Sequence, residues 1–304
     1  MKALLLAVLL DHLLKEPPRW HPLVGFGWLA NRAEAWFYGP AVTTPWSRRL
    51  RGLFALLLLL GGIVLPLSVG LRALGGYAWL AEAILLYLAL GGASLGQHAA
   101  EISAALQAGD LAQAREKVGR IVSRDTAAMD ESAVARAGVE SVLENGCDAI
   151  FGAVFWFFVA GAPGAAAYRL ANTLDAMWGY KNAQYRHFGW AAARLDDALN
   201  WIPARLTALT YTLLGNAPLA WRCWRGQARA WESPNAGPVM AAGAGALSVQ
   251  LGGPALYHGQ LEDRPLLGIG APPGGQDIGR AMMLVRRGLW LWLAVAGIGG
   301  WALA

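Results

Sequence analysis

One stretch of the chain concentrates the side chains that could do chemistry. Residues 172–205 place carboxylates, amides and cations between two strongly apolar segments. The ionisable and amide residues concerned are Asp175, Lys181, Asn182, Arg186, His187, Arg194, Asp196, Asp197, Asn200 and Arg205. Only 15% of the chain is charged, and such groups are costly to leave unpaired beside membrane-like segments. Each has a structural explanation when taken singly, but the grouping favours a site for anionic ligands and a metal.

A second set of carboxylates recurs every four residues in the preceding segment. In a helix, Glu140, Glu144 and Asp148 would share one face as the helix meets the membrane. Mg²⁺ needs only one or two protein carboxylates and bridges to substrate phosphates, so this spacing is consistent with a divalent-metal site. Asn145 adds an oxygen ligand nearby. The alternative is simple neutralisation of one acid by Arg136, one turn before Glu140.

The run Ser123-Arg124-Asp125-Thr126 has two interpretations of equal weight. It could be a capped turn between helices, because Asp and Thr commonly bond to backbone N–H groups there. It could also contact phosphate through Arg124, with Asp125 orienting the guanidinium or a metal. The sequence lacks the usual G-x-x-x-x-G-K-[ST] phosphate loop, so a bound nucleotide would need an uncommon site.

Helices in or beside a membrane must position these side chains. The chain is 56% hydrophobic, has a mean hydropathy of +0.37 and contains 15 Trp and 38 Gly. Charge-free runs at 53–71, 149–168 and 288–304 each approach the roughly 20 residues that cross a bilayer core. We therefore expect one all-α integral-membrane domain over residues 1–304, a polytopic bundle of about five to eight membrane-embedded helices.

The other segments complete this expected architecture. We predict a retained first helix at 1–14, a return span near 77–96 that contains Glu82, and a cytoplasmic helical segment at 97–148. Within that segment Gly109 ends one helix, Asp110 caps the next, and Asp130 caps a helix that runs to about residue 146.

The later segments are less regular. Gly161, Pro163 and Gly164 predict a broken helix or a hairpin between 149 and about 177. Residues 206–221 either cross the membrane or enter partway and return, 236–251 form a short, tightly packed helix, and 252–279 form a loop.

The charge distribution argues against a nucleic-acid-binding protein, and the cysteine spacing argues against a disulfide-stabilised or zinc-binding one. The net charge is +5, but its arginines lie in short flanks beside apolar runs, which indicates membrane orientation and no nucleic-acid partner. Cys147 and Cys223 fit neither a disulfide framework nor a zinc site, so both are expected to be packing residues.

The polar stretch also carries a family resemblance. The run NTLDAMWGYKNAQYRHFGWAAARLDDALNWIPARL, which begins at Asn172, resembles the signature of the adenosylcobinamide-phosphate synthase family of cobalamin biosynthesis, the CbiB/CobD family. Further landmarks of that family recur in order along nearly the whole chain. They are EPPRWHP at 16–22, SRDT at 123–126, ESVLENGCDA at 140–149, SPNAG at 233–237 and DRP at 263–265.

The resemblance implies a carbon–nitrogen ligase. It would join adenosylcobyric acid, a cobalt-containing corrinoid, to (R)-1-amino-2-propanol phosphate and give adenosylcobinamide phosphate, using ATP and Mg²⁺. Because a carboxylate is a poor acyl donor, activation as an acyl phosphate shielded from water is expected. The resemblance also implies a multi-pass protein of the cell inner membrane with its active site at the cytoplasmic face. Other membrane enzymes of the pathway are candidate partners.

On this hypothesis the site residues divide by role. The expected catalytic residues are Asp125, Asp175 and Asp197; the phosphate-binding residues are Arg124, Lys181, Arg186 and Arg194; the substrate-binding residues are Asn145, Asn172, Asn182, Tyr185, Asn200 and Asn235; and the metal ligands are Glu140, Glu144, Asp148 and Asp196.

Two alternatives from other classes remain open. One is a membrane transporter in which Glu82, Asp175 and Asp197 would be intramembrane ion sites. The other is a non-catalytic scaffold for a biosynthetic complex. Charges concentrated in one segment and its neighbours favour an enzyme, because transporters scatter them over several spans.

Overall fold

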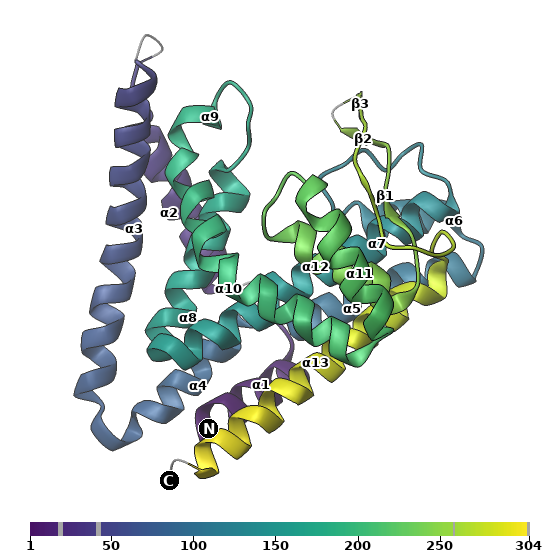
Figure 1. Cartoon of the computed structure of the whole chain (residues 1–304). Coiled ribbons are helices and arrows are strands. Elements are labelled where there is room, and N and C mark those ends of the chain that lie inside the picture. Colours follow the sequence, from purple (N-terminus) through teal and green to yellow (C-terminus); the bar gives the residue numbers. More distant parts are fainter. Residues whose placement is uncertain (18–20, 41–43, 258, 303–304) are drawn as a thin grey trace. The chain divides into compact units, whose positions relative to one another are not determined.

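Helices make up most of the chain, which divides into two units (Figure 1). A computed structural model describes residues 1–17, 21–40, 44–257 and 259–302. Unit 1 comprises Met1–Gly91 and Gly152–Asn200, and unit 2 comprises Gly92–Phe151 and Trp201–Ala304. The landmark at 16–22 is therefore described only in part, since Pro18, Arg19 and Trp20 lie outside the described residues.

Unit 1 contains the longest apolar helix of the N-terminal half. Its elements are α1 (Lys2–Leu14), α2 (Pro22–Phe37), α3 (Pro45–Ala73), the 3₁₀ turn η1 (Gly75–Tyr77), α4 (Ala78–Ala89), α8 (Gly152–Trp178), α9 (Tyr185–Phe188) and the start of α10 (Trp190–Leu214). Thr44 caps α3 by accepting a hydrogen bond from the Ser47 N–H at 3.2 Å, and Pro45 suits the first helical position. The buried core of the unit includes Phe26, Leu56 and Trp178.

The predicted break in the helix after residue 149 is confirmed within α8. Ala160 and Gly161 leave helical geometry, and Gly161 has φ of 64°, a conformation that glycine adopts without steric cost. Pro163 follows, which lacks a backbone N–H. The Trp156 indole donates to the Leu199 carbonyl at 3.0 Å, so the first part of α8 is tied to α10.

Unit 2 packs short, small-residue helices around α7. Its elements are α5 (Gly92–Gln107), α6 (Leu111–Val118), α7 (Glu131–Gly146), the π-helical turn η2 (Cys147–Phe151), α11 (Ala217–Gln227), the 3₁₀ turn η3 (Ala228–Ala230), α12 (Ala236–Leu247), α13 (Gly275–Ala302) and the end of α10. Each residue of α12 is buried. A Cβ at Gly243 would lie 2.7 Å from Leu143, so glycine lets α12 approach α7 closely.

The helix ends predicted in this unit are confirmed. Asp110 accepts from the Gln113 N–H at 2.9 Å at the start of α6, and Asp130 accepts from the Ala133 N–H at 2.7 Å at the start of α7. Gly109, between α5 and α6, has φ of 71°. Both aspartates thus satisfy a backbone donor that the first helical turn leaves free.

Residues 252–279, expected to be a loop, contain short strands as well. Strands β1 (Leu251–Gly252) and β4 (Leu266–Leu267) pair antiparallel, and β2 (Ala255–Tyr257) pairs with β3 (Gln260–Glu262) as a hairpin. Gly259 turns the hairpin with φ of 76°, next to His258, which lies outside the described residues. Buried Leu251 and Leu267 anchor the first pair to the core of unit 2. The glycines that suggested a loop therefore mark turns between strands.

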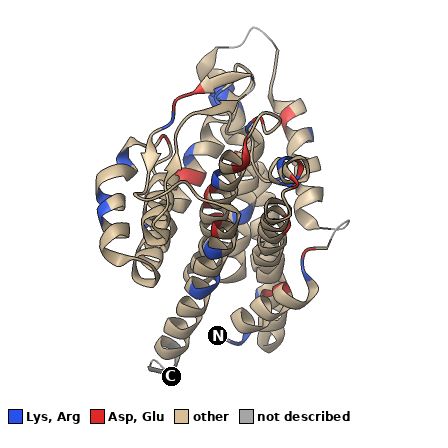
Figure 2. Cartoon of the chain, turned by 90° about the vertical axis from the view of Figure 1, so that its right-hand side faces the viewer, with Lys and Arg blue, Asp and Glu red and all other residues tan. Residues whose placement is uncertain are grey.

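The predicted polytopic all-α class is confirmed. Four helical runs are long and apolar enough to cross a membrane: Pro45–Ala73, Gly75–Gln107, Glu131–Trp178 and Gly275–Gly299. The first three contain the expected spans at 53–71, 77–96 and 149–168, and the fourth covers residues 288–299 of the expected run at 288–304. Residues 206–221 comprise the end of α10 and the start of α11 and belong to none of the four. Large side chains such as Leu57, Leu65 and Trp290 are exposed, as expected for lipid-facing positions. Charged residues occupy only small parts of the ribbon (Figure 2).

Candidate functional site

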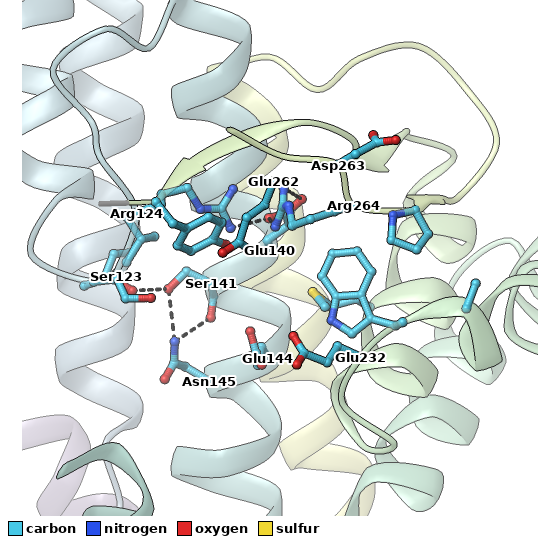
Figure 3. Close-up of a pocket in the computed structure, with 17 residues that line it drawn as sticks. Ser123, Arg124, Glu140, Ser141, Glu144, Asn145, Glu232, Glu262, Asp263 and Arg264 are labelled. Atoms are coloured by element: carbon cyan, nitrogen blue, oxygen red, sulfur yellow. Dashed lines mark hydrogen bonds and ion pairs between the residues drawn. The ribbon is translucent and has the colours of Figure 1, made fainter. Parts of the chain in front are cut away.

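A polar cavity of about 620 Å³ lies within unit 2 (Figure 3). Most of its polar lining comes from three segments that are far apart in the sequence: residues 123–124 before α7, residues 140–145 on α7, and residues 262–264 at the end of the β2–β3 hairpin. Trp231 and Glu232, just before α12, complete the wall. The sequence landmarks SRDT, ESVLENGCDA and DRP therefore meet at one cavity.

Glu140 is the centre of this arrangement. Its side chain is only 2% exposed, and its carboxylate accepts from Arg124 Nη2 at 2.5 Å and from Arg264 Nη1 at 3.1 Å. The Gly252 N–H donates to the other oxygen at 2.7 Å. A buried carboxylate is tolerated only with such partners, so the network fixes both guanidinium groups at the cavity wall.

Aromatic rings flank both guanidinium groups. Arg124 lies over Tyr257, with 5.9 Å from Cζ to the ring centroid, and Arg264 lies over Trp231 at 5.2 Å. Burial alone would lower the pKa of Arg124, but the Glu140 carboxylate outweighs it and the net pKa is raised. Arg124 therefore stays fully charged, held in place and able to face an anion.

The other charged residues of the described lining are acidic. Glu144, Glu232, Glu262 and Asp263 join Glu140, so five acids and two arginines are among the described lining residues. Figure 3 shows Glu144 and Glu232 directed toward the same part of the cavity. Asn145 donates to the Ser141 carbonyl at 2.9 Å and to its hydroxyl oxygen at 3.0 Å. Cationic and acidic walls in one cavity suit a ligand that carries both phosphate and a counter-cation.

A second polar cluster lies within unit 1, between α8 and α10. Asp196 accepts from Asn172 Nδ2 at 3.2 Å and from Asn200 Nδ2 at 3.1 Å. The Tyr168 hydroxyl donates to Asn200 Oδ1 at 2.8 Å, and Arg169 donates to Asn172 at 3.4 Å. The structure thus brings together Asn172, Asp196 and Asn200 from the long signature motif.

The carboxylates of this cluster are held in an unfavourable environment. Burial raises the pKa of Asp196, the amides of Asn172 and Asn200 oppose that shift, and the neighbouring Asp197 reinforces it. Burial also raises the pKa of Asp197, against the lowering influence of Arg194 and Lys181. Arg194 reaches Asp197 at 3.5 Å but is 67% exposed, so its compensation is weak. The pKa of each acid is therefore raised toward neutral pH, as expected for a group that exchanges protons.

The other predicted residues have individual contacts. Asp125 accepts from the Gly259 N–H at 2.7 Å and so supports the β2–β3 hairpin. Asn182 accepts from the Tyr185 N–H at 2.9 Å, and the Tyr185 hydroxyl donates to Glu34 at 3.1 Å. Asn235 is buried and accepts from Arg205 at 2.8 Å.

The predicted phosphate-binding and metal residues are divided between the units. Unit 2 contains Arg124, Glu140, Glu144 and Asp148. Asp148 lies in the π-helical turn η2, and such turns are frequent at functional sites. The remaining members, Lys181, Arg186, Arg194 and Asp196, belong to unit 1, with Asp175 nearby in sequence on α8. Lys181, Arg186 and Arg194 are exposed. Convergence of the two groups into one pocket stays a prediction.

The metal assignment also stays a prediction. Among the described residues, no group of three or more His, Cys, Asp or Glu side chains is arranged to hold a metal ion. Glu140 is committed to two arginines in the structure, whereas Glu144 faces the cavity. Cys147 and Cys223 are both buried and form no disulfide, in agreement with packing roles.

Several lining residues were missed by the sequence reasoning. Arg264 is the most important, since it shares Glu140 with Arg124. It lies within the DRP landmark, and Trp231 and Glu232 directly precede SPNAG, so the recurrence of family motifs was the available signal. Tyr257 and Glu262 belong to the hairpin in the segment that was expected to be a loop.

Comparisons with known proteins agree on one family. The family described as CobD/Cbib protein matches residues 4–285. A cobalamin biosynthesis protein CobD of Chromobacterium violaceum is 61% identical, with 96% of this chain and 94% of that protein covered. Its namesake in Stutzerimonas stutzeri is 58% identical, with 98% and 97% covered, and that of Mycobacterium tuberculosis is 40% identical, with 93% and 90% covered. No solved structure matches the chain.

Proposed function

The chain belongs to the CobD/CbiB family, and we propose that it is an adenosylcobinamide-phosphate synthase of cobalamin biosynthesis. It joins the propionate carboxyl of adenosylcobyric acid to the amine of (R)-1-amino-2-propanol phosphate, with ATP and Mg²⁺. The observation that carries the proposal is the meeting of three distant family landmarks at the cavity of unit 2. A fold alone would not justify a function, but a shared site built from the family's own motifs does.

Phosphate binding is the first task of this cavity. Arg124 and Arg264 present guanidinium groups that Glu140 and two aromatic rings hold in fixed orientations. Arginine matches phosphate oxygens through paired N–H donors, and a pre-oriented pair loses little freedom on binding. Phosphates of ATP or of the aminopropanol substrate are the ligands that this wall fits.

The acidic wall fits a magnesium ion beside those phosphates. Mg²⁺ takes one or two carboxylates, keeps several waters and completes its coordination with phosphate oxygens, so it requires no cage of three protein acids. Glu144 and Glu232 line the same cavity as the arginines and are the proposed ligands. Bound there, Mg²⁺ would neutralise charge on the phosphates during carboxyl activation.

The cluster in unit 1 supplies the proton acceptor in this proposal. The substrate's ammonium must lose one proton before the amine can attack an activated carboxyl, and a base works best when its pKa lies close to the operating pH. Burial raises the pKa of Asp197 toward that range, and Asp197 is the residue assigned to accept the proton. Asn172 and Asn200 orient Asp196 beside it.

The four long apolar helical runs support a membrane location, and the active site is assigned to the cytoplasmic face, where ATP is available. The deciding experiment gives the purified, detergent-solubilised chain ATP, Mg²⁺, adenosylcobyric acid and aminopropanol phosphate. Mass spectrometry should detect the amide product, dependent on ATP. A folded chain that yields no product, or the same yield without ATP, would contradict the proposal and favour the transporter alternative.

A further inference from the structure

A second cavity, of about 720 Å³, lies within unit 1 among α3, α4 and α8. Its lining is mostly apolar and includes Val64, Leu71, Trp156 and Leu199. Of the described residues that line it, one is an acid, Glu82, and one is a base, Arg72. The roles assigned under the proposed function use neither residue, and the cavity is formed by helical runs long enough to span a membrane.

Glu82 is the unusual member of this lining. It lies on α4, whose other residues are uncharged, and no described residue forms a hydrogen bond or ion pair with its carboxylate. An ionisable group in a membrane-spanning helix is costly, so it normally has a partner and a function. The break in α8 lies directly opposite, because a Cβ added at Gly161 would lie 3.5 Å from Glu82 Oε1. Glu82 thus faces a wall where the regular helical hydrogen bonding is interrupted.

Arg72 and the surrounding surface place this cavity close to a membrane–water boundary. Arg72 is exposed in the last turn of α3, just before the turn η1. Tyr77 is 76% exposed and Trp79 38% exposed at the start of α4, and aromatic side chains of this kind are typical of the interface. Glu82 follows four residues after Ala78, the first residue of α4, which places it roughly 6 Å deeper along the helix axis.

We propose that this cavity binds the headgroup of a phospholipid that carries a primary ammonium, as phosphatidylethanolamine does. The ammonium would contact Glu82, and the phosphate would contact Arg72. A primary ammonium offers three N–H donors to a carboxylate, whereas a quaternary ammonium offers none. The apolar lining would take the first carbons of the acyl chains, as expected for a site open to lipid. The inference does not depend on the ligase proposal.

The test compares lipids that differ only in the headgroup. The full-length chain is delipidated in a mild detergent and equilibrated with equal amounts of phosphatidylethanolamine, phosphatidylcholine and phosphatidylglycerol with identical acyl chains. Native mass spectrometry then counts the retained lipids. We expect phosphatidylethanolamine to be retained roughly tenfold better than phosphatidylcholine, the factor for one hydrogen bond to a charged group. Equal retention of the two lipids would overturn the proposal.

Variants assign the preference to the two residues. Glu82→Gln should abolish the preference for the primary ammonium, and Arg72→Gln should weaken the binding of all three lipids. The control is Glu116→Gln on α6, an exposed residue paired with Arg120, which should change nothing. A preference that survives in Glu82→Gln would contradict the assignment. If that variant does not fold, Glu82→Asp and a series of N-methylated headgroups on the unaltered chain provide the same test.

A water-soluble source of the same chemistry must also be distinguished. Phosphoethanolamine contains the ammonium and the phosphate but no acyl chain. We expect it not to displace the bound lipid, because the apolar lining contributes to binding. Displacement by phosphoethanolamine at concentrations comparable to those of the lipid would mean that the site takes a soluble amine phosphate, and the lipid assignment would fail.

Discussion

The two polar clusters of the protein surround a carboxylate with opposite kinds of hydrogen-bond donor. In unit 2, Glu140 accepts from two guanidinium groups and a backbone N–H. In unit 1, Asp196 accepts from the neutral amides of Asn172 and Asn200 and lies beside a second acid, Asp197. Charged donors compensate the desolvation of a carboxylate, whereas neutral amides leave its pKa raised. The charge of the hydrogen-bond donors, more than the depth of burial, therefore determines that Glu140 has a structural role and that Asp196 can exchange a proton.

This difference assigns different chemistry to the two units. The fixed anion of unit 2 orients two cations toward a cavity, which suits phosphate recognition. In unit 1 the pKa values of Asp196 and Asp197 are raised toward neutral pH, which suits proton transfer. Substitutions that remove one of these groups from its cluster test the comparison.

The largest effect is expected from Glu140→Gln. The substitution leaves two guanidinium groups without their shared carboxylate, and breaking a buried ion pair on one side costs about 3–5 kcal/mol. We expect a large fall in the apparent melting temperature and loss of amide formation in the same preparation. The matched control is Glu116→Gln, whose exposed pair with Arg120 should contribute almost nothing. If the Glu140→Gln protein melted and turned over normally, the ion network would have no role in stability or activity.

Arg264→Gln should have the second largest effect, and mainly on turnover. Arg124 and the Gly252 N–H still satisfy Glu140, so the fold should persist. Loss of one pre-oriented cation at a phosphate site lowers turnover by roughly a hundredfold. Arg264→Lys should recover only part of this loss, because an ammonium cannot donate in the same paired geometry. If Arg264→Gln turned over as fast as the unaltered chain, the cavity would not be the site of the reaction.

Asp196→Asn should change the pH dependence of stability in unit 1. A carboxyl whose folded pKa lies above its unfolded value of 3.8 stabilises the fold at low pH, and this contribution is lost as pH rises through the folded pKa. The unaltered chain should therefore lose apparent melting temperature from about pH 4 upward, and Asp196→Asn should flatten that decline by a few degrees. Melting in detergent from about pH 4 to about pH 8 measures it. A steeper decline in the variant would show that the sign is wrong.

Local signals in the sequence were enough to place many of the elements. Asp110 and Asp130 cap the predicted helices because a cap depends on a few neighbouring residues, and the break at Gly161 follows from backbone geometry in the same way. Charge-free length likewise indicated the membrane runs.

The sequence alone did not reveal which residues far apart in the chain would contact one another. Spacing aligned Glu140 and Glu144 on one helical face, but it did not reveal that Arg264, more than a hundred residues later, would share Glu140 with Arg124. The hairpin that carries Tyr257 was hidden because its glycines also fit a loop. Which charge neutralises which acid is decided by tertiary contacts, so the metal and phosphate roles could be proposed only as a group.

The smallest effect is expected from Asp130→Ala, which tests whether the ion network depends on the helix that carries it. Asp130 caps α7 at 2.7 Å, ten residues before Glu140, and loss of an N-cap costs about 1 kcal/mol. We expect slightly lower melting but unchanged turnover, because Glu140 is held by Arg124, Arg264 and Gly252. Asp130→Asn retains a capping oxygen and should behave like the unaltered chain. A large loss of turnover in Asp130→Ala alone would mean that the start of α7, as well as the ion network, positions Glu140.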